Sequence, residues 1–223
     1  MFRSLCASIS VACILFALSG CGTTGQQATA YQLESIKQLR TSLETGSKQI
    51  SATVGALEQL AATTSGDLKP AYQKFTTELA KLDSDAATAR SRSAAMKERA
   101  KEHLEMWEKE MREGMTNPEL RKISEQQRAQ ARERFEDLRN TTETGRDAYR
   151  RLSDDLHEIQ KALDLNLNAA GVAALKPVVD STKADAQVVQ NSIGEVVTKL
   201  DRVTTALSST SGGPAPASAP ATN

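Results

Sequence analysis

Residues 68–107 read LKPAYQKFTTELAKLDSDAATARSRSAAMKERAKEHLEMW and carry the most regular apolar spacing in the chain. Apolar and small side chains recur in it at alternating steps of four and three residues, with polar and charged residues between them. This seam consists of Leu68, Tyr72, Phe75, Leu79, Leu82, Ala86, Ala89, Ser93, Met96, Ala100, His103 and Trp107. A stripe with this period lies along one side of an α-helix and packs against other helices. The stretch therefore predicts one long helix with a narrow core-facing side.

Three further segments carry the same period. Before the seam, Ile36, Leu43, Ile50 and Leu57 recur every seven residues, which predicts a helix from about Ala30 to Ala62. After it, a third helix is expected to carry a stripe from residue 135 to residue 163, and a fourth a stripe from residue 175 to residue 207. The fourth is expected over residues 169–208, and Pro177 near its first turns predicts a kink or a later start.

Short breaks separate these helices. In the first break, Gly66 suits a C-cap and Asp67 suits a cap of the next helix. In the second, Asn117 followed by Pro118 is a typical helix start. Short turns make neighbouring helices antiparallel. The sequence predicts an all-α fold, an elongated antiparallel four-helix bundle with coiled-coil-like packing.

The middle two helices are longer than the outer two. When the chain is folded about its turns, Tyr31 lies level with about Ala100, and Leu207 lies level with about Gln127. Residues 101–126 then have no flanking helices, and we expect them to project as a hairpin of the second and third helices. Acids and bases are interspersed there at spacings of three and four, which suits helices with little buried surface.

The first residues resemble the export signal of a bacterial lipoprotein precursor. Arg3 precedes an uncharged apolar run over residues 5–18, which is too short to span a bilayer as a helix. The run ends in Leu18-Ser19-Gly20-Cys21, which resembles a lipobox. The resemblance implies cleavage between Gly20 and Cys21 and acylation (diacylglycerol and palmitate) of Cys21. The alternatives are an ordinary secretory signal with a chance cysteine and an uncleaved membrane anchor.

Several expectations follow from that resemblance. Cys6 and Cys13 would be discarded with the signal peptide, so the mature chain would have no free thiol. Gly22, in the position where aspartate retains lipoproteins in the inner membrane, favours the periplasmic face of the outer membrane over the inner membrane. The chain then divides into a signal peptide (1–20), a lipidated linker (21–30), a helical bundle (31–207) and a disordered Ser/Gly/Pro/Ala-rich tail (208–223).

Composition and motifs argue against catalysis and nucleic-acid binding. The chain has 28 Lys and Arg residues and 28 Asp and Glu residues, so it has no net positive charge that would attract nucleic acid. A di-iron bundle needs Glu-x-x-His on two helices, but Ala100 precedes His103 and Asp154 precedes His157 at that spacing. No catalytic residue, metal site or cofactor is therefore expected, and the protein is not expected to be an enzyme.

The hairpin turn is the one candidate contact site. Met106, Trp107, Met111 and Met115 place apolar groups amid balanced charge near this tip. In an up-down-up-down chain the tip lies at the same end as both termini, so a lipid on Cys21 would point it toward the membrane. We expect contact of the tip with the membrane or a partner. The alternative is that Trp107 only seals the end of the bundle against the third helix.

Three segments resemble one family of bacterial proteins. They are Gly66-Asp67-Leu68 with Ala71-Tyr72 and Lys74, then Trp107-Glu108 with Glu110, then Leu163 and Asn166-Leu167-Asn168-Ala169 with Val172 and Ala174-Leu175. Together, over about residues 31–207, they resemble the domain of unknown function 2959 family. The resemblance implies a lipobox and a helical body and supplies no activity.

Two function classes remain after these exclusions. The first is a structural or protein-interaction role in the cell envelope, held to the membrane by the N-terminal lipid and serving an unidentified envelope protein. The second is a periplasmic carrier or sensor that opens its bundle for an apolar ligand. The narrow seam of small residues favours the first, because a carrier needs a roomy apolar cavity.

Overall fold

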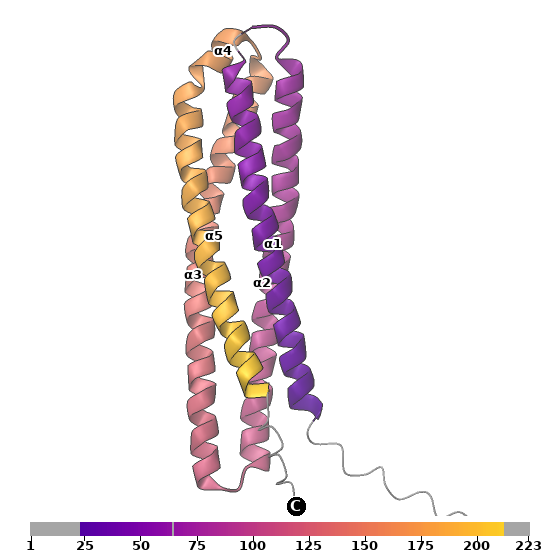
Figure 1. Cartoon of the computed structure of the whole chain (residues 1–223), viewed down its shortest axis with the longest axis vertical. Helices are drawn as coiled ribbons and strands as arrows, with labels where there is room; N and C mark the ends of the chain where they lie inside the picture. The colour runs from indigo at the N-terminus through magenta and orange to yellow at the C-terminus, as the bar shows by residue number, and fades with distance from the viewer. Residues whose placement is uncertain (1–22, 64, 212–223) are drawn as a thin grey trace, which may run out of the picture.

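The computed structural model of the chain describes residues 23–63 and 65–211, and this part is helical without a β-strand. Figure 1 shows a long rod of antiparallel helices. The helices are α1 (Thr23–Ala62), α2 (Lys69–Gly114), α3 (Pro118–Leu165), α4 (Ala169–Ala174) and α5 (Lys176–Ser211). At 1.5 Å per residue α2 and α3 are each about 70 Å long. The predicted all-α bundle with up-down-up-down topology is confirmed.

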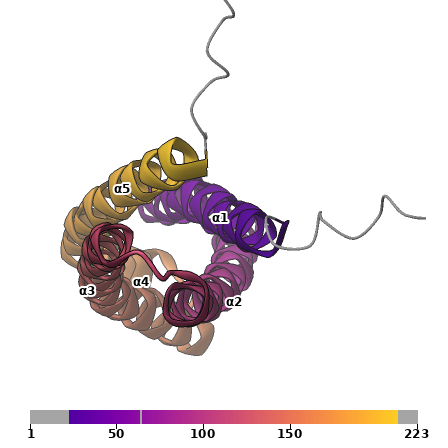
Figure 2. The same cartoon turned by 90° about the horizontal axis from the view of Figure 1, so that it is seen from below.

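The four long helices enclose the axis of the rod in the order α1, α2, α3, α5, as the end-on view shows (Figure 2). Contact is most extensive between α1 and α2, and it is least extensive between α2 and α3 although these are the two longest helices. The short α4 lies across the end where α3 turns into α5 (Figure 1), and its Val172 is buried. We call this end the α4 end and the opposite end, where α2 turns into α3, the hairpin end.

The core lies along the predicted seams and divides into two clusters. The cluster toward the α4 end is built around Phe75, Leu79, Leu82, Leu152 and Leu156. The cluster toward the hairpin end contains Ile36, Leu39, Met96, Leu138, Val196, Leu200, Val203 and Leu207. Between them the seams carry small and polar residues; a Cβ on Gly145 would lie 3.5 Å from that of Ser192. Because the side chains there are small or polar, the helices approach closely but little apolar surface is buried at this level.

Side chains end and start the helices largely as the sequence indicates. The Asn117 side chain accepts hydrogen bonds from the backbone N–H groups of Glu119 (2.9 Å) and Leu120 (3.3 Å), and Pro118 opens α3. The Asp67 carboxylate accepts from the N–H of Lys69 at 3.0 Å. Gly66 is not the C-cap of α1, which ends four residues earlier; its φ of 90° instead forms the turn.

Three helix boundaries differ from those expected. The first helix begins at Thr23 and not near Ala30, so it extends seven residues before the start that its apolar period predicted. The fourth is interrupted at Leu175, so that α5 starts just before Pro177, where proline is tolerated. It ends at Ser211 and not at Ser208. Residues 1–22 and 212–223, which include the predicted signal peptide and most of the predicted tail, lie outside the described part.

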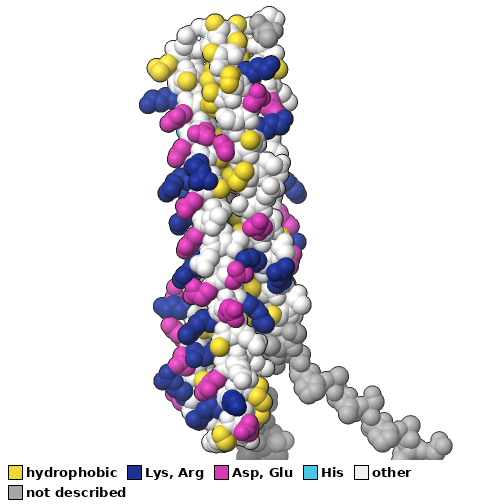
Figure 3. Space-filling model, turned by 90° about the vertical axis from the view of Figure 1, so that its left-hand side faces the viewer, with side chains coloured by type: hydrophobic (Ala, Val, Ile, Leu, Met, Phe, Trp, Pro, Cys, Tyr) yellow, Lys and Arg dark blue, Asp and Glu magenta, His cyan; other side chains and the backbone are white. Residues whose placement is uncertain are grey.

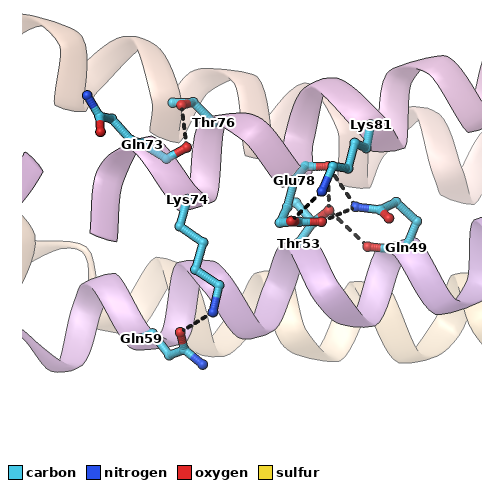
Figure 4. A network of polar contacts seen from close by, with 8 residues as sticks. All are labelled: Gln49, Thr53, Gln59, Gln73, Lys74, Thr76, Glu78 and Lys81. Atoms are coloured by element: carbon cyan, nitrogen blue, oxygen red, sulfur yellow. Dashed lines mark hydrogen bonds and ion pairs between the residues drawn. The ribbon is translucent and has the colours of Figure 1, made fainter. Parts of the chain in front are cut away.

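A polar network joins α1 to α2 in the cluster toward the α4 end (Figure 4). The buried hydroxyl of Thr53 contacts the carbonyl oxygens of Gln49 (2.9 Å) and Glu78 (3.1 Å). The Gln49 amide donates to the carbonyl of Glu78 (3.0 Å) and to its carboxylate (2.7 Å). Lys81 completes the set with an ion pair to Glu78 at 2.8 Å. The network ties the register of α2 to that of α1 at one level.

Candidate functional site

The hairpin of α2 and α3 extends beyond the ends of the outer helices (Figure 1). Two contacts fix the register: the Arg99 guanidinium lies 5.4 Å from the ring centroid of Tyr31, and Lys199 pairs with Asp137 at 2.6 Å. Tyr31 is thus level with about residue 100, as expected. Because α1 begins earlier than predicted, the unflanked part of α2 is about two turns shorter than residues 101–114.

The predicted tip residues lie at different depths. Met111 is buried, while Met106, Trp107 and Met115 are half-buried. The indole N–H of Trp107 donates to the hydroxyl of Ser124 at 2.8 Å, and Ser124 is itself buried. The ring also meets His103 edge to face, with centroids 5.9 Å apart. This geometry fits the alternative in which Trp107 closes the end of the bundle against α3.

A groove of about 480 Å³ separates α2 from α3 just above the tip. Its apolar lining comes from Met96, Ala100 and Leu104 of α2 and from Phe135 of α3. Charged side chains form the rest of the lining, chiefly Glu105 on α2 and Arg128, Arg132 and Arg139 on α3. The groove is open to solvent on one side and contains both signs of charge, so it resembles a protein-contact surface more than an apolar ligand cavity.

One ion cluster closes the tip end of this groove. Glu108 on α2 contacts Arg112 on its own helix and Arg128 on α3, the latter at 2.8 Å. The hydrogen bond and the charge of Arg112, with the charge of Arg128, hold the pKa of Glu108 below its ordinary value. The side chains of Arg128 and Glu108 are largely covered, so solvent screens this cross-helix ion pair less than the exposed pairs.

Two apolar side chains that the sequence reading missed are exposed at the tip. They are Leu120 and Ile123 in the first turns of α3, with 56% and 49% of their surface exposed, and we call them the tip pair. The α3 stripe passes through Ser124, so Ile123 is rotated about 100° away from it. The stripe predicted for the third helix began at residue 135 and did not extend to this part of α3. The space-filling view shows charged side chains of both signs along the rod to its hairpin end, where a few hydrophobic side chains lie among them (Figure 3).

The two histidines are not brought together. His103 is half-buried beside Trp107, and burial lowers its pKa from 6.5, opposed by the charge of Glu110. His157 is exposed and lies 3.1 Å from Asp83. In residues 23–63 and 65–211, no group of three or more His, Cys, Asp or Glu side chains is arranged to hold a metal ion. Gly20 and Cys21, the predicted cleavage and lipidation positions, lie outside the described residues.

No helix in the described part of the chain combines the length and the apolar character needed to cross a membrane.

Comparison with known proteins identifies the family. A family model described as "Protein of unknown function (DUF2959)" matches residues 20–207, which is most of the chain. The chain therefore belongs to the domain of unknown function 2959 family, as its three segments around residues 66–74, 107–110 and 163–175 indicated. No curated protein and no solved structure gave a match.

Proposed function

We propose that this protein is a lipid-anchored helical rod of the cell envelope that acts through protein contacts and not through catalysis. The lipobox-like Leu18-Ser19-Gly20-Cys21 supports the anchor and the export. Two or three acyl chains, at about 0.8 kcal/mol per buried CH₂, would make attachment durable. Gly22 favours the periplasmic face of the outer membrane.

The observation that carries the interaction role is the α2–α3 hairpin. It extends past the outer helices, it has an open groove, and its rim contains interspersed acids and bases. Such a surface can recognise a partner through complementary charges and a small apolar contact, without a large hydrophobic interface. The partner proposed is a protein of the same envelope compartment.

Photo-crosslinking in the producing bacterium tests this role. A photoreactive amino acid replaces Glu105, which is exposed and lines the groove, and in a matched control it replaces Glu195, which is exposed on α5. We expect a discrete crosslinked species from position 105 that is absent from position 195 and is lost when Cys21→Ser removes the anchor. Identical patterns from both positions would argue against a hairpin-directed partner.

A second candidate function is a periplasmic carrier or sensor for an apolar ligand. It is favoured by the apolar side of the groove, which is lined by Met96, Leu104 and Phe135. Native mass spectrometry of the protein purified from its own membrane tests it. Co-purified lipid or another apolar molecule, released by Leu104→Glu, would support a carrier over a contact surface.

A further inference from the structure

The tip pair forms a small apolar patch near the hairpin end of the rod, two and five residues after the start of α3. Leu120 and Ile123 are three residues apart on α3, so their side chains lie on the same side of the helix. The other large apolar side chains that are exposed in the described part are Tyr31, Leu165, Val178 and Val188, none of which belongs to the hairpin. Single exposed apolar residues are common on protein surfaces and need no explanation. These two, however, lie together on the hairpin that projects beyond the other helices.

The position of the tip follows from the α1–α2 register. Tyr31 stacks against Arg99. From Tyr31 back to its first residue, Thr23, α1 covers about 12 Å toward the hairpin end, at 1.5 Å per residue. From Arg99 to its end at Gly114, α2 extends about 22 Å in the same direction. The hairpin therefore passes the start of α1 by about 10 Å.

The length of chain before α1 limits how far the tip can stand from the anchor. Cys21 is two residues from Thr23, a span of at most about 7 Å when extended. With that span fully extended in an upright rod, the turn at the end of α2 lies about 3 Å beyond the level of Cys21, and Leu120, two residues into α3, lies about level with Cys21. Any shorter span places both closer to the bilayer. A ten-residue flexible linker would have let the hairpin stand clear of the bilayer; the helix that begins at Thr23 leaves only two residues for that purpose.

We propose that the tip pair of Leu120 and Ile123 enters the interfacial region of the phospholipid bilayer that holds the lipid on Cys21. The inference rests on the proposed lipid anchor. Interfacial segments bury their apolar side chains about 5–10 Å into the boundary between headgroups and acyl chains. Arg121 and Lys122 lie between the two apolar residues and are exposed, and long basic side chains of this kind reach back to phosphate groups. Arg121 also donates to the carbonyl of Met115 at 2.7 Å, which holds the turn against α3.

Tryptophan quenching by brominated lipid tests this contact. The chain from Cys21 onward is coupled through its single thiol to a maleimide lipid in phosphatidylcholine vesicles, with or without bromine on the acyl chains. Trp107→Phe removes the native fluorophore, and Ile123→Trp then introduces a probe at the tip. The matched control is Val188→Trp on α5, because Val188 is 52% exposed and lies far from the tip. Circular dichroism checks folding; if Trp107→Phe disturbs the helices, Trp107 is retained and the emission of the parent chain is subtracted.

We expect the tip probe to lose about half of its emission in brominated vesicles, since an indole at interfacial depth lies within reach of the quencher, while the Val188 probe is unchanged. Two results overturn the proposal. If neither probe is quenched, the tip stands in water; if both are quenched equally, the rod lies along the bilayer. The tether is supplied chemically, so these outcomes do not depend on natural lipidation, which mass spectrometry of the native N-terminus decides separately.

Discussion

Trp107 of α2 donates its indole N–H to the hydroxyl of Ser124 in α3, at 2.8 Å. Ser124 is buried although it lies among charged residues, and its hydroxyl is the polar partner that allows the indole to pack against α3. The bond fastens the two helices to each other at about the level where α1 begins and α5 ends. The first prediction concerns this bond.

We expect Ser124→Ala to destabilise the protein by about 1 kcal/mol, because the half-buried indole N–H loses its acceptor. Denaturant unfolding followed by the fluorescence of Trp107 measures both the free energy of unfolding and the environment of the ring. Ser84→Ala, at an exposed position of α2, is the control and should have no effect. Unchanged unfolding in both variants would mean that the bond does not hold the hairpin.

The core prediction concerns four leucines of the two longest helices. Leu79, Leu82, Leu152 and Leu156 are at most 1% exposed. Leu→Ala at each should cost about 2–5 kcal/mol, toward the lower end where small neighbours let the site collapse. Leu165→Ala is the control, since Leu165 is 82% exposed. Thermal and denaturant melts of the chain made without residues 1–21 measure the change, and four unshifted melts would contradict the packing.

The α1–α2 network predicts a pH-dependent effect at Glu78. The hydrogen bond from Lys81, followed by that from Gln49, lowers the pKa of Glu78 from 4.5. A carboxyl whose pKa is lower in the folded state contributes stability above its unfolded pKa and loses it as the pH falls through the folded value. Glu78→Gln should therefore destabilise the protein at neutral pH. The deficit should disappear once the pH is below the folded pKa of Glu78.

Melts of the wild type and Glu78→Gln at several pH values test this, with Glu195→Gln on the exposed side of α5 as the control. A Glu78→Gln deficit that persists undiminished in acid would show that packing, and not the charge, is responsible.

His103 predicts a second loss of stability as the pH falls, at a higher pH than that of Glu78. Burial lowers its pKa from 6.5, so the unfolded chain takes up a proton more readily than the folded one. Its contribution to stability is full above the unfolded pKa and is lost as the pH falls from that value toward the folded pKa. Between about pH 7.5 and about pH 5.5, wild type should lose stability relative to His103→Leu. If the stabilities of the two proteins change in parallel over this pH range, His103 is not the cause of the pH dependence.

The anchor prediction concerns Cys21. If the lipobox-like motif is read by the export machinery, the mature N-terminus begins at Cys21 and carries acyl mass, and Cys21→Ser leaves an unlipidated precursor. Mass spectrometry of the purified protein measures both. A free amino terminus at another residue, without acyl mass, would refute lipidation and with it the membrane-anchored role.

The bundle was predictable because its information is local and periodic. Steps of three and four residues place Phe75, Leu79 and Leu152 on one side of their helices whatever the partner is, and these residues are buried. Breaks such as Asn117-Pro118 satisfy backbone groups within a few residues, so they too are readable from the sequence. Adding helix lengths between such breaks was enough to place Tyr31 beside residue 100 and to predict a projecting hairpin.

By itself, then, the sequence determined the number, direction and inward-facing sides of the long helices, since each depends on spacing along one segment. The tertiary structure decided what depends on two segments at once. It gave Trp107 its partner on α3, left the tip pair of Leu120 and Ile123 exposed, and opened the groove between α2 and α3. It also extended α1 to Thr23, where no apolar period marks a helix. Periodicity identifies the side of a helix that can be buried, whereas the neighbouring helices determine which parts of it are covered.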